Sequence, residues 1–461
     1  MSRDKRIKWH MLPVILALAW PTMLEQLMQT AVQYIDTGMV AVLGTQATAA
    51  VGATSTVNWL VGSTISALAI GFLAVISRAY GAEDYVRTKK ASAQAVLGVL
   101  ALGSLFTLLT LGFSSQVPIW MQVEAPLQAM AARYFFILYL PMLPRTATII
   151  FGTVLRSVGD TKTPMVVGVL VNICNVVLNF FFIYPSRLVQ LWGTELWLPG
   201  CGWGVEGAAA ASAVAFTLGG ICITVAYWRH KVVSPKGQNF RPDGTILKPC
   251  LKIALPNMLQ RFGTSLGYVV FASMINGFGE VATAAHTIAN TVESAFYIPG
   301  YGMQQAAATL TGQAYGAKDS QKMKDVASMF LPLEVALMIV SGGLLFLFAP
   351  VMMDLFSDNA QVISQGALVL RMVAVTEPFY GVTIIIQGLM QGVGDTKTAF
   401  VYDVFGMWAV RIFGTFLCIA LWDLGFVSAW VCMILHNMLL FVLFLRYYRK
   451  GRWNPLENKV M

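Results

Sequence analysis

The stretch VGDTKT at Val158–Thr163 recurs unchanged at Val393–Thr398 and decides how the rest of the chain is divided. We call the difference in numbering between the two copies (394 − 159 = 235 for their glycines) the repeat offset. Pro21 and Pro256 are separated by the same offset, as are the YGA trios that begin at Tyr80 and Tyr315. A fixed spacing of this kind is the signature of an internal repeat. The chain is therefore predicted to be a duplication.

The composition places both copies in a membrane. Hydrophobic residues make up 57% of the chain and charged residues 11%, and the mean hydropathy is +0.67. These values lie far from those of soluble domains. Twelve apolar segments are long enough to cross a bilayer, which takes about 20 residues: 11–43, 51–79, 91–113, 127–155, 163–184, 204–228, 250–277, 284–313, 326–350, 361–390, 399–421 and 424–447. We predict an all-α integral membrane protein.

Six spans in each copy fix how the copies are related. An even number returns the chain to the side where it began, so both halves enter the membrane in the same direction and form parallel repeats. We expect two six-helix bundles related by pseudo-twofold symmetry, at residues 1–229 and 249–461. The polar segment 230–248 is predicted to be a cytoplasmic linker, and a basic tail follows the last span.

Lys and Arg residues gather in the loops on one side of this topology. Loops rich in Lys and Arg face the cytoplasm, so both termini are predicted to be cytoplasmic. The protein is expected in the plasma membrane, which is the inner membrane in a bacterium. Topology and contact with anionic lipid account for the net charge of +9, and no nucleic-acid partner is needed.

Four polar residues follow one face of the first span. Glu25, Gln29, Gln33 and Asp36 are spaced by four, four and three residues, which brings their side chains together along a helix. Polar groups at membrane depth are costly and are therefore candidates for function. Asp36 lies farthest from the cytoplasmic side.

The fifth span carries a second row, Asn172, Asn175 and Asn179. Carboxylate and amide oxygens suit Na⁺, and a buried carboxylate can hold a proton. We predict a cation site formed by Asp36, Asn175 and Asn179, with Gln33 and Asn172 beside it. Na⁺ at Asp36 is the only metal ion that is expected. The alternative is that these residues form hydrogen bonds between packed helices and nothing more.

The repeat offers an internal comparison. Shifting the polar positions by the repeat offset leads to apolar or small partners: Phe271 for Asp36, Met407 for Asn172, Val410 for Asn175 and Gly414 for Asn179. The predicted cation chemistry therefore belongs to the amino-terminal half.

The second half has charges of its own within predicted spans: Glu293, Glu334, Glu377, Asp403 and Arg411. Most are expected to pair structurally. Glu293 and Asp403 are kept as candidates for substrate contact or coupling, as are Glu25 and Gln29 in the first half.

Enzymatic activity is not expected. The four histidines lack metal-ligand spacing, and no nucleophile can be assembled with a base. The GDTKT loops lack the glycine spacing of a phosphate-binding loop and are predicted to be tight turns capped by Asp or Thr. No cofactor is expected.

These motifs together resemble the multidrug and toxic compound extrusion (MATE) family. The resemblance rests on YIDT at Tyr34–Thr37, the paired GDT loops and NVVLN at Asn175–Asn179. The last motif resembles the N-x-x-L-N form of NorM-like members, in which the Asp and both Asn line a cation site. Other branches place an Asp at the position of Asn179.

The resemblance implies secondary antiport: Na⁺ or H⁺ enters while an amphipathic, often cationic, organic compound leaves. Alternating access by rocking of the two halves around a central cleft would follow, with no ATP site and with a monomeric protein. One alternative is a lipid-linked oligosaccharide flippase of the same wider superfamily, for which a cationic cleft is expected. A membrane-embedded enzyme is the other.

Overall fold

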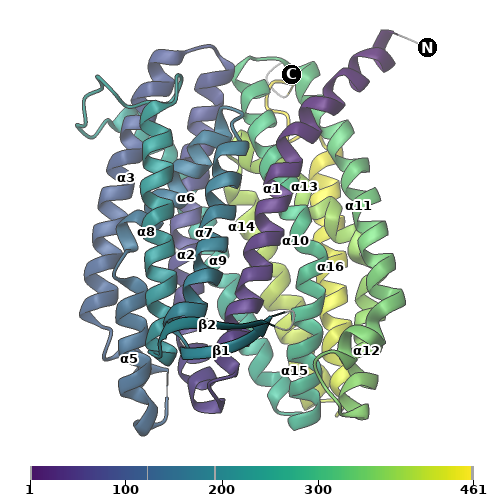
Figure 1. Ribbon diagram of the computed structural model, residues 1–461. Helices are drawn as coiled ribbons and strands as arrows, with labels where there is room; N and C mark the ends of the chain where they lie inside the picture. Colours follow the sequence, from purple (N-terminus) through teal and green to yellow (C-terminus); the bar gives the residue numbers. More distant parts are fainter. Residues whose placement is uncertain (1–2, 122, 192–193, 458–461) are drawn as a thin grey trace. The chain divides into compact units, whose positions relative to one another are not determined.

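The computed structural model describes residues 3–121, 123–191 and 194–457 (Figure 1). Helices form almost all of this part of the chain. The first half contains α1 (Arg3–Ala41), α2 (Thr45–Gly81), α3 (Tyr85–Gly112), α4 (Val117–Trp120), α5 (Ala125–Tyr139), α6 (Met142–Ser157), α7 (Lys162–Phe182), β1 (Pro185–Leu191), β2 (Thr194–Cys201) and α8 (Gly204–Arg229).

The second half follows the same order of helices. It contains α9 (Gly244–Asn276), α10 (Glu280–Gly316), α11 (Ser320–Asp354), α12 (Ala360–Ala374), α13 (Glu377–Val393), α14 (Thr396–Phe405), the π-helix η1 (Gly406–Ile412), α15 (Phe413–Ala420) and α16 (Phe426–Arg449).

These helices match the twelve predicted spans in order. By length and composition, eight helices in the described residues could each cross a membrane, counting α14 to α15 as one, and two bent helix pairs bring the number to ten. Two of the twelve predicted spans, 250–277 and 284–313, are not among these ten. They coincide with α9 and α10, which have 33 and 37 residues. The predicted all-α membrane fold is confirmed.

Two spans that were predicted to be continuous are broken. The α5–α6 pair is bent by 50° and the α12–α13 pair by 56°. Prolines lie at both breaks: Pro141 precedes α6, and Pro378 lies in the first turn of α13. Proline lacks the N–H that a continuous helix needs, so it ends or kinks a helix. The new helices begin at Met142 and Glu377, which are again separated by the repeat offset (377 − 142).

A β-hairpin joins α7 to α8, in the segment between the predicted spans 163–184 and 204–228. Strands β1 and β2 pair in antiparallel fashion, with Arg187 opposite Leu198 (Figure 1). In the second half, α15 and α16 are joined directly by residues 421–425. The hairpin is therefore an addition to the first half alone.

The linker is shorter than the predicted segment 230–248, because α9 already begins at Gly244. The Asp243 side chain accepts hydrogen bonds from the Thr245 backbone N–H at 2.8 Å and the Thr245 hydroxyl at 2.7 Å. This capping of the exposed N–H groups starts the helix early. Gln94 on α3 holds the linker through Arg241 O at 2.9 Å and Asp243 N at 3.0 Å.

By contacts the chain forms two compact units. The amino-terminal unit consists of residues 27–72 and 85–248, and the carboxy-terminal unit consists of 1–26, 73–84 and 249–461. Helices α1 and α2 are thus each shared between the units. The predicted bundles at 1–229 and 249–461 are defined by the internal repeat, whereas the two compact units are defined by contacts. The units therefore do not test the bundle limits, which stay a prediction.

The two YGA motifs meet within the carboxy-terminal unit. A Cβ atom on Gly81 would overlap the carbonyl of Gln313, and one on Gly316 would overlap the carbonyl of Arg78. Arg78 and Gln313 are themselves separated by the repeat offset (313 − 78), so the contact is reciprocal. We call it the glycine crossing. Because each backbone occupies the place of the other's side chain, glycine is required at both positions.

Candidate functional site

Three of the predicted cation-site residues come together in the amino-terminal unit, in a group that we call the Asp36 centre. Asp36 lies in the last two turns of α1, which ends at Ala41, and Asn179 lies in the last turn of α7, which ends at Phe182. The Asn179 amide nitrogen donates to Asp36 Oδ1 at 2.6 Å. The centre therefore lies near the carboxy-terminal ends of these two helices.

Asn175 completes the centre. Its amide nitrogen donates to the two oxygens of Asp36 at 2.7 and 3.0 Å, and its amide oxygen accepts from the Ser212 hydroxyl on α8 at 2.9 Å. The orientation of the amide is assigned from this network of hydrogen bonds. Ser212 was not predicted, because a lone serine in an apolar span gives no signal.

Burial within the centre is uneven. The exposed fraction is 5% for Asn175 and 1% for Asn179, whereas Asp36 is half-buried. Among the described residues, Asn179 Oδ1 has no hydrogen-bond partner. Tyr184 fixes the end of α1 by donating to Met39 O at 3.1 Å. The centre thus holds an accessible carboxylate between buried amides, each with an oxygen that can accept a hydrogen bond or bind a hard cation.

The other predicted residues of the two rows lie outside this centre. Gln29 and Gln33 are exposed, and Asn172 is half-buried. No hydrogen bond joins Gln33 or Asn172 to Asp36 within the part of the chain that the structure describes. Glu25 belongs to the segment of α1 that groups with the carboxy-terminal unit.

A second acid is held by amides in the carboxy-terminal unit, in a group that we call the Asp403 centre. Asp403 on α14 is 7% exposed. It accepts from the amide of Gln260 on α9 and from Gln387 Nε2 on α13 at 3.0 and 3.1 Å. Gln304 on α10 extends the network to Gln387 Oε1 at 3.5 Å. Neither Gln304 nor Gln387 was predicted, although each is an amide inside an apolar span.

Glu293 belongs to a different group of buried acids. Glu293, Glu334 and Glu377 come from α10, α11 and α13, and the other two act electrostatically on Glu377. Among the described residues, both carboxylate oxygens of Glu334 and one of Glu377 have no hydrogen-bond partner. Three His, Cys, Asp or Glu side chains placed to hold a metal ion are found nowhere in the described ranges.

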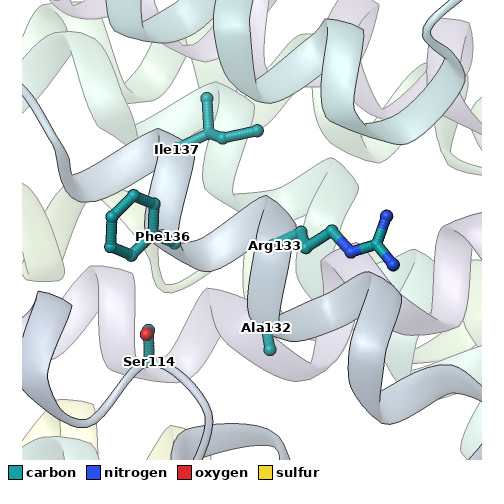
Figure 2. Close-up of a pocket in the computed structure, with 5 residues that line it drawn as sticks. All are labelled: Ser114, Ala132, Arg133, Phe136 and Ile137. Carbon is teal, nitrogen blue, oxygen red and sulfur yellow. The ribbon is translucent and has the colours of Figure 1, made fainter.

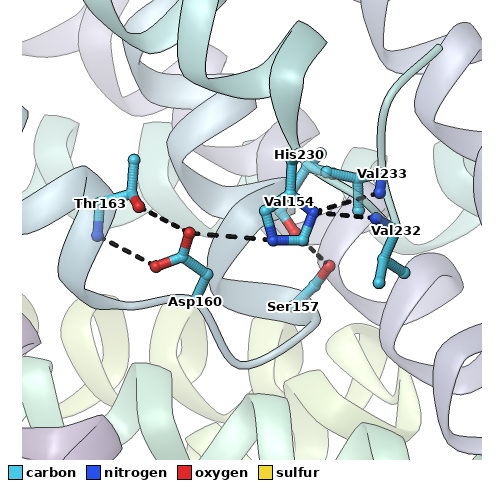
Figure 3. A network of polar contacts seen from close by, with 7 residues as sticks. All are labelled: Val154, Ser157, Asp160, Thr163, His230, Val232 and Val233. Carbon is cyan, nitrogen blue, oxygen red and sulfur yellow. Dashed lines mark hydrogen bonds and ion pairs between the residues drawn. The ribbon is translucent and has the colours of Figure 1, made fainter. Parts of the chain in front are cut away.

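The two GDTKT turns are capped as predicted. Asp160 accepts from the Thr163 N–H at 3.0 Å and hydroxyl at 2.6 Å, and Asp395 accepts from the Thr398 N–H at 3.2 Å. Figure 3 shows His230 between Asp160, 3.9 Å from its Nε2, and the backbone N–H groups that donate to its Nδ1. Burial lowers the pKa of His230.

A pocket of about 290 Å³ opens beside α5 (Figure 2). Four lining residues, Ala132, Arg133, Phe136 and Ile137, are on α5, and Ser114 is on a separate segment. Its one charge, Arg133, already pairs with Glu206 at 3.1 Å. None of the predicted site residues lines this pocket, so it is not the candidate site.

Comparisons with known proteins agree on one family. The family model described as MatE matches residues 21–181 and 256–417, and the starts of the two matches are separated by the repeat offset (256 − 21). A probable multidrug resistance protein NorM from Thermotoga maritima is 25% identical over 440 residues, covering 95% of this chain and 92% of that protein.

Solved structures share the fold. A MOP superfamily transporter from Pyrococcus furiosus matches with a TM-score of 0.88 at 24% identity, covering 96% of each chain. A structure described as MATE in the bent conformation matches with a TM-score of 0.87 at 23% identity, covering 97% of this chain and 96% of the other.

Proposed function

We propose, because this chain belongs to the MatE family, that it is a secondary active antiporter which exports amphipathic, often cationic, organic compounds in exchange for Na⁺ or H⁺. The chain is a multi-pass membrane transporter and not an enzyme. The observation that carries the proposal is the Asp36 centre, where one carboxylate contacts two buried amide nitrogens.

The chemistry of the centre supports exchange. When Asp36 is ionised, the amides of Asn175 and Asn179 donate to it and stabilise its charge. When a proton binds, the new hydroxyl needs an acceptor, which an amide oxygen supplies once the amide has turned. When Na⁺ binds, the same oxygens are suitable hard ligands. Either ion neutralises the one charge, which is costly at membrane depth.

Competition for that charge provides the coupling. A cationic substrate and the driving ion each compensate the carboxylate of Asp36, so binding of one weakens binding of the other. With the Lys- and Arg-rich loops in the cytoplasm, the Asp36 centre lies toward the outer end of α1 and α7. We infer that the driving ion enters from outside and displaces the exported compound there.

The proposal is tested with purified protein in liposomes. Efflux of a fluorescent organic cation is measured under an imposed Na⁺ gradient and, separately, under an imposed pH gradient. We expect at least one gradient to drive accumulation against the dye's own gradient. Asp358→Asn serves as the control for loss of an acid outside the Asp36 centre, because Asp358 is an exposed acid between α11 and α12.

Two results would contradict the proposal. Dye movement that ignores both gradients would exclude antiport. Scrambling of labelled lipid without dye transport would favour a flippase instead. The choice between Na⁺ and H⁺ follows from which gradient drives transport.

A further inference from the structure

Four side chains of the carboxy-terminal unit, three of them buried and His286 half-buried, form a group rich in hydrogen-bond donors, which we call the donor cluster. It comprises His286 on α10, Arg411 on η1, and Trp430 and His436 on α16. The exposed fractions of Arg411, Trp430 and His436 are 2%, 0% and 5%. Within the described residues, Arg411 Nε, His286 Nδ1, Trp430 Nε1 and both ring nitrogens of His436 have no hydrogen-bond partner.

Packing around one ring brings the cluster together. The Arg411 guanidinium carbon lies 4.2 Å from the ring centroid of Phe271, and the His286 ring meets the same ring edge-on at 5.6 Å. His286 also meets Trp430 edge-on, with the ring centroids 5.6 Å apart. Arg411 acts electrostatically on His286 and His436. The four residues therefore share one environment.

The backbone at this place is irregular. Residues 406–412 form a π-helix, and π-helices occur frequently at functional sites. A Cβ atom on Gly406 would lie 2.8 Å from His436 Cδ2, so the imidazole packs directly on the glycine backbone. Arg411 Nη2 lies 3.0 Å from the sulfur of Met433, which lies between Trp430 and His436 on α16.

Every unpartnered atom in this group is a nitrogen. Guanidinium and indole N–H groups can only donate, and a neutral imidazole has one N–H to donate. A buried donor without an acceptor costs about 1–3 kcal/mol. Arg411 acts electrostatically on Glu293, yet no carboxylate in the described ranges forms an ion pair with it. What the group lacks is an acceptor with a negative charge.

We propose that the donor cluster binds a single anionic group, which is either a halide ion or the carboxylate of a transported compound. The second source rests on the proposed export function.

The carboxylate source is tested by binding to purified protein in detergent, where no gradient is needed. Fluorescence polarisation is measured for zwitterionic tetramethylrhodamine and for its methyl ester, which differ in the carboxylate alone. We expect Arg411→Gln to weaken binding of the acid at least about tenfold and that of the ester less than about twofold. Trp430→Phe, which keeps an aromatic ring and removes one N–H, should weaken binding of the acid about threefold.

The matched control is Arg145→Gln. Arg145 is the corresponding kind of residue in the amino-terminal unit, a half-buried arginine over the ring of Phe216 at 4.9 Å. This variant should leave the ratio of acid to ester affinity unchanged. If Arg411→Gln fails to fold, the Trp430→Phe result decides the outcome.

The halide source is tested without any dye. The midpoint of thermal unfolding is measured in sodium chloride, sodium bromide and sodium gluconate at equal ionic strength. A rise in both halides that Trp430→Phe abolishes would assign the cluster to a halide ion. Unchanged acid-to-ester ratios in both cluster variants, together with no halide effect, would overturn the proposal. Antiport is tested separately, by transport of the ester in liposomes. If antiport alone fails, the ratio of acid to ester affinity measured in detergent still tests the anion site.

Discussion

The Asp36 and Asp403 centres each hold an acid by amides from another helix, but the helix that carries the acid and the helix that carries the amide are exchanged between the two halves. In the first half, the acid is on the first helix, α1, and the amides are on the fifth, α7. In the second half, the acid is on the corresponding fifth helix, α14, and an amide, Gln260, is on the corresponding first helix, α9. The separation in numbering between the bonded residues is the same in both halves (179 − 36 and 403 − 260).

The exchange also changes depth. Asn179 lies in the last turn of α7, which begins at Lys162, whereas Asp403 lies much closer to the start of its own helix, α14, at Thr396. At a rise of about 1.5 Å per residue, these positions are roughly 25 and 10 Å from their capped turns. Asp36 is half-buried and Asp403 is buried. The duplication thus kept the pairing of helices and changed the depth, the exposure and the helix that carries the acid.

The largest effect is expected from Asp36→Asn, which should reduce ion-driven efflux at least about 100-fold. The variant keeps the shape of the side chain but cannot bind a proton or compensate a cation. Asp403→Asn should cost less than about tenfold, because its buried carboxylate cannot exchange ions as readily. Initial rates in liposomes with equal amounts of folded protein check this. The reverse order would assign coupling to the Asp403 centre.

The two amides of the Asp36 centre allow a more specific comparison between the two halves. Asn175→Leu and Asn179→Leu should each weaken the apparent affinity for the driving ion at least about tenfold, or about 1.4 kcal/mol, because each removes an oxygen ligand. Titration of transport against Na⁺ and against pH measures the effect. Val410→Leu, at the repeat-offset partner of Asn175 (410 − 175), is the control and should leave the ion dependence unchanged. No change in either Asn variant would show that these amides only pack helices.

The smallest effect is expected at the capped turns. His230 Nδ1 accepts from the N–H groups of Val232 and Val233 at 3.2 and 3.3 Å, and these bonds are lost when Nδ1 is protonated. The pKa of His230 is lowered in the folded protein, so the unfolded chain binds the proton more readily. Stability should therefore be full above the ordinary pKa of about 6.5 and fall below it, by at most about 2 kcal/mol at pH 5.

Thermal unfolding between pH 5 and pH 8 checks this prediction. His230→Gln should flatten the decline on the acid side. In the second half, the Tyr447 hydroxyl donates to Asp395 at 2.6 Å, and a tyrosine keeps its proton throughout this range. Tyr447→Phe should therefore lower stability equally at every pH. An acid decline that persists unaltered in His230→Gln would place its origin elsewhere.

The sequence predicted features that repeat along one helix or between the two copies. Twelve apolar segments, the capped turns and the row of Asn175 and Asn179 are of this kind. The breaks at Pro141 and Pro378 were missed because hydropathy stays high through them, and the π-helix has no hydropathy signal. Spacing along a helix also does not indicate which residue of another helix will meet it, so Ser212 and Gln387 could not be paired.

The repeat offset matches only residues that both halves keep at the same position. Asp403 falls opposite Gly168 (403 − 235), so the offset did not indicate a second centre. The equivalent of the Asp36 centre lies at another depth, with donor and acceptor helices exchanged. Only the contacts of the folded chain bring Gln260 to Asp403.

The glycine crossing has a consequence for the origin of this molecule. Gly81 meets the backbone of Gln313, and Gly316 meets the backbone of Arg78, so each contact is the image of the other. This is the isologous geometry of a twofold homodimer. In such a dimer, any mutation would change both subunits at once. A single chain that carries both copies is free of that constraint except where the two copies touch, so each half can place its acid on a different helix.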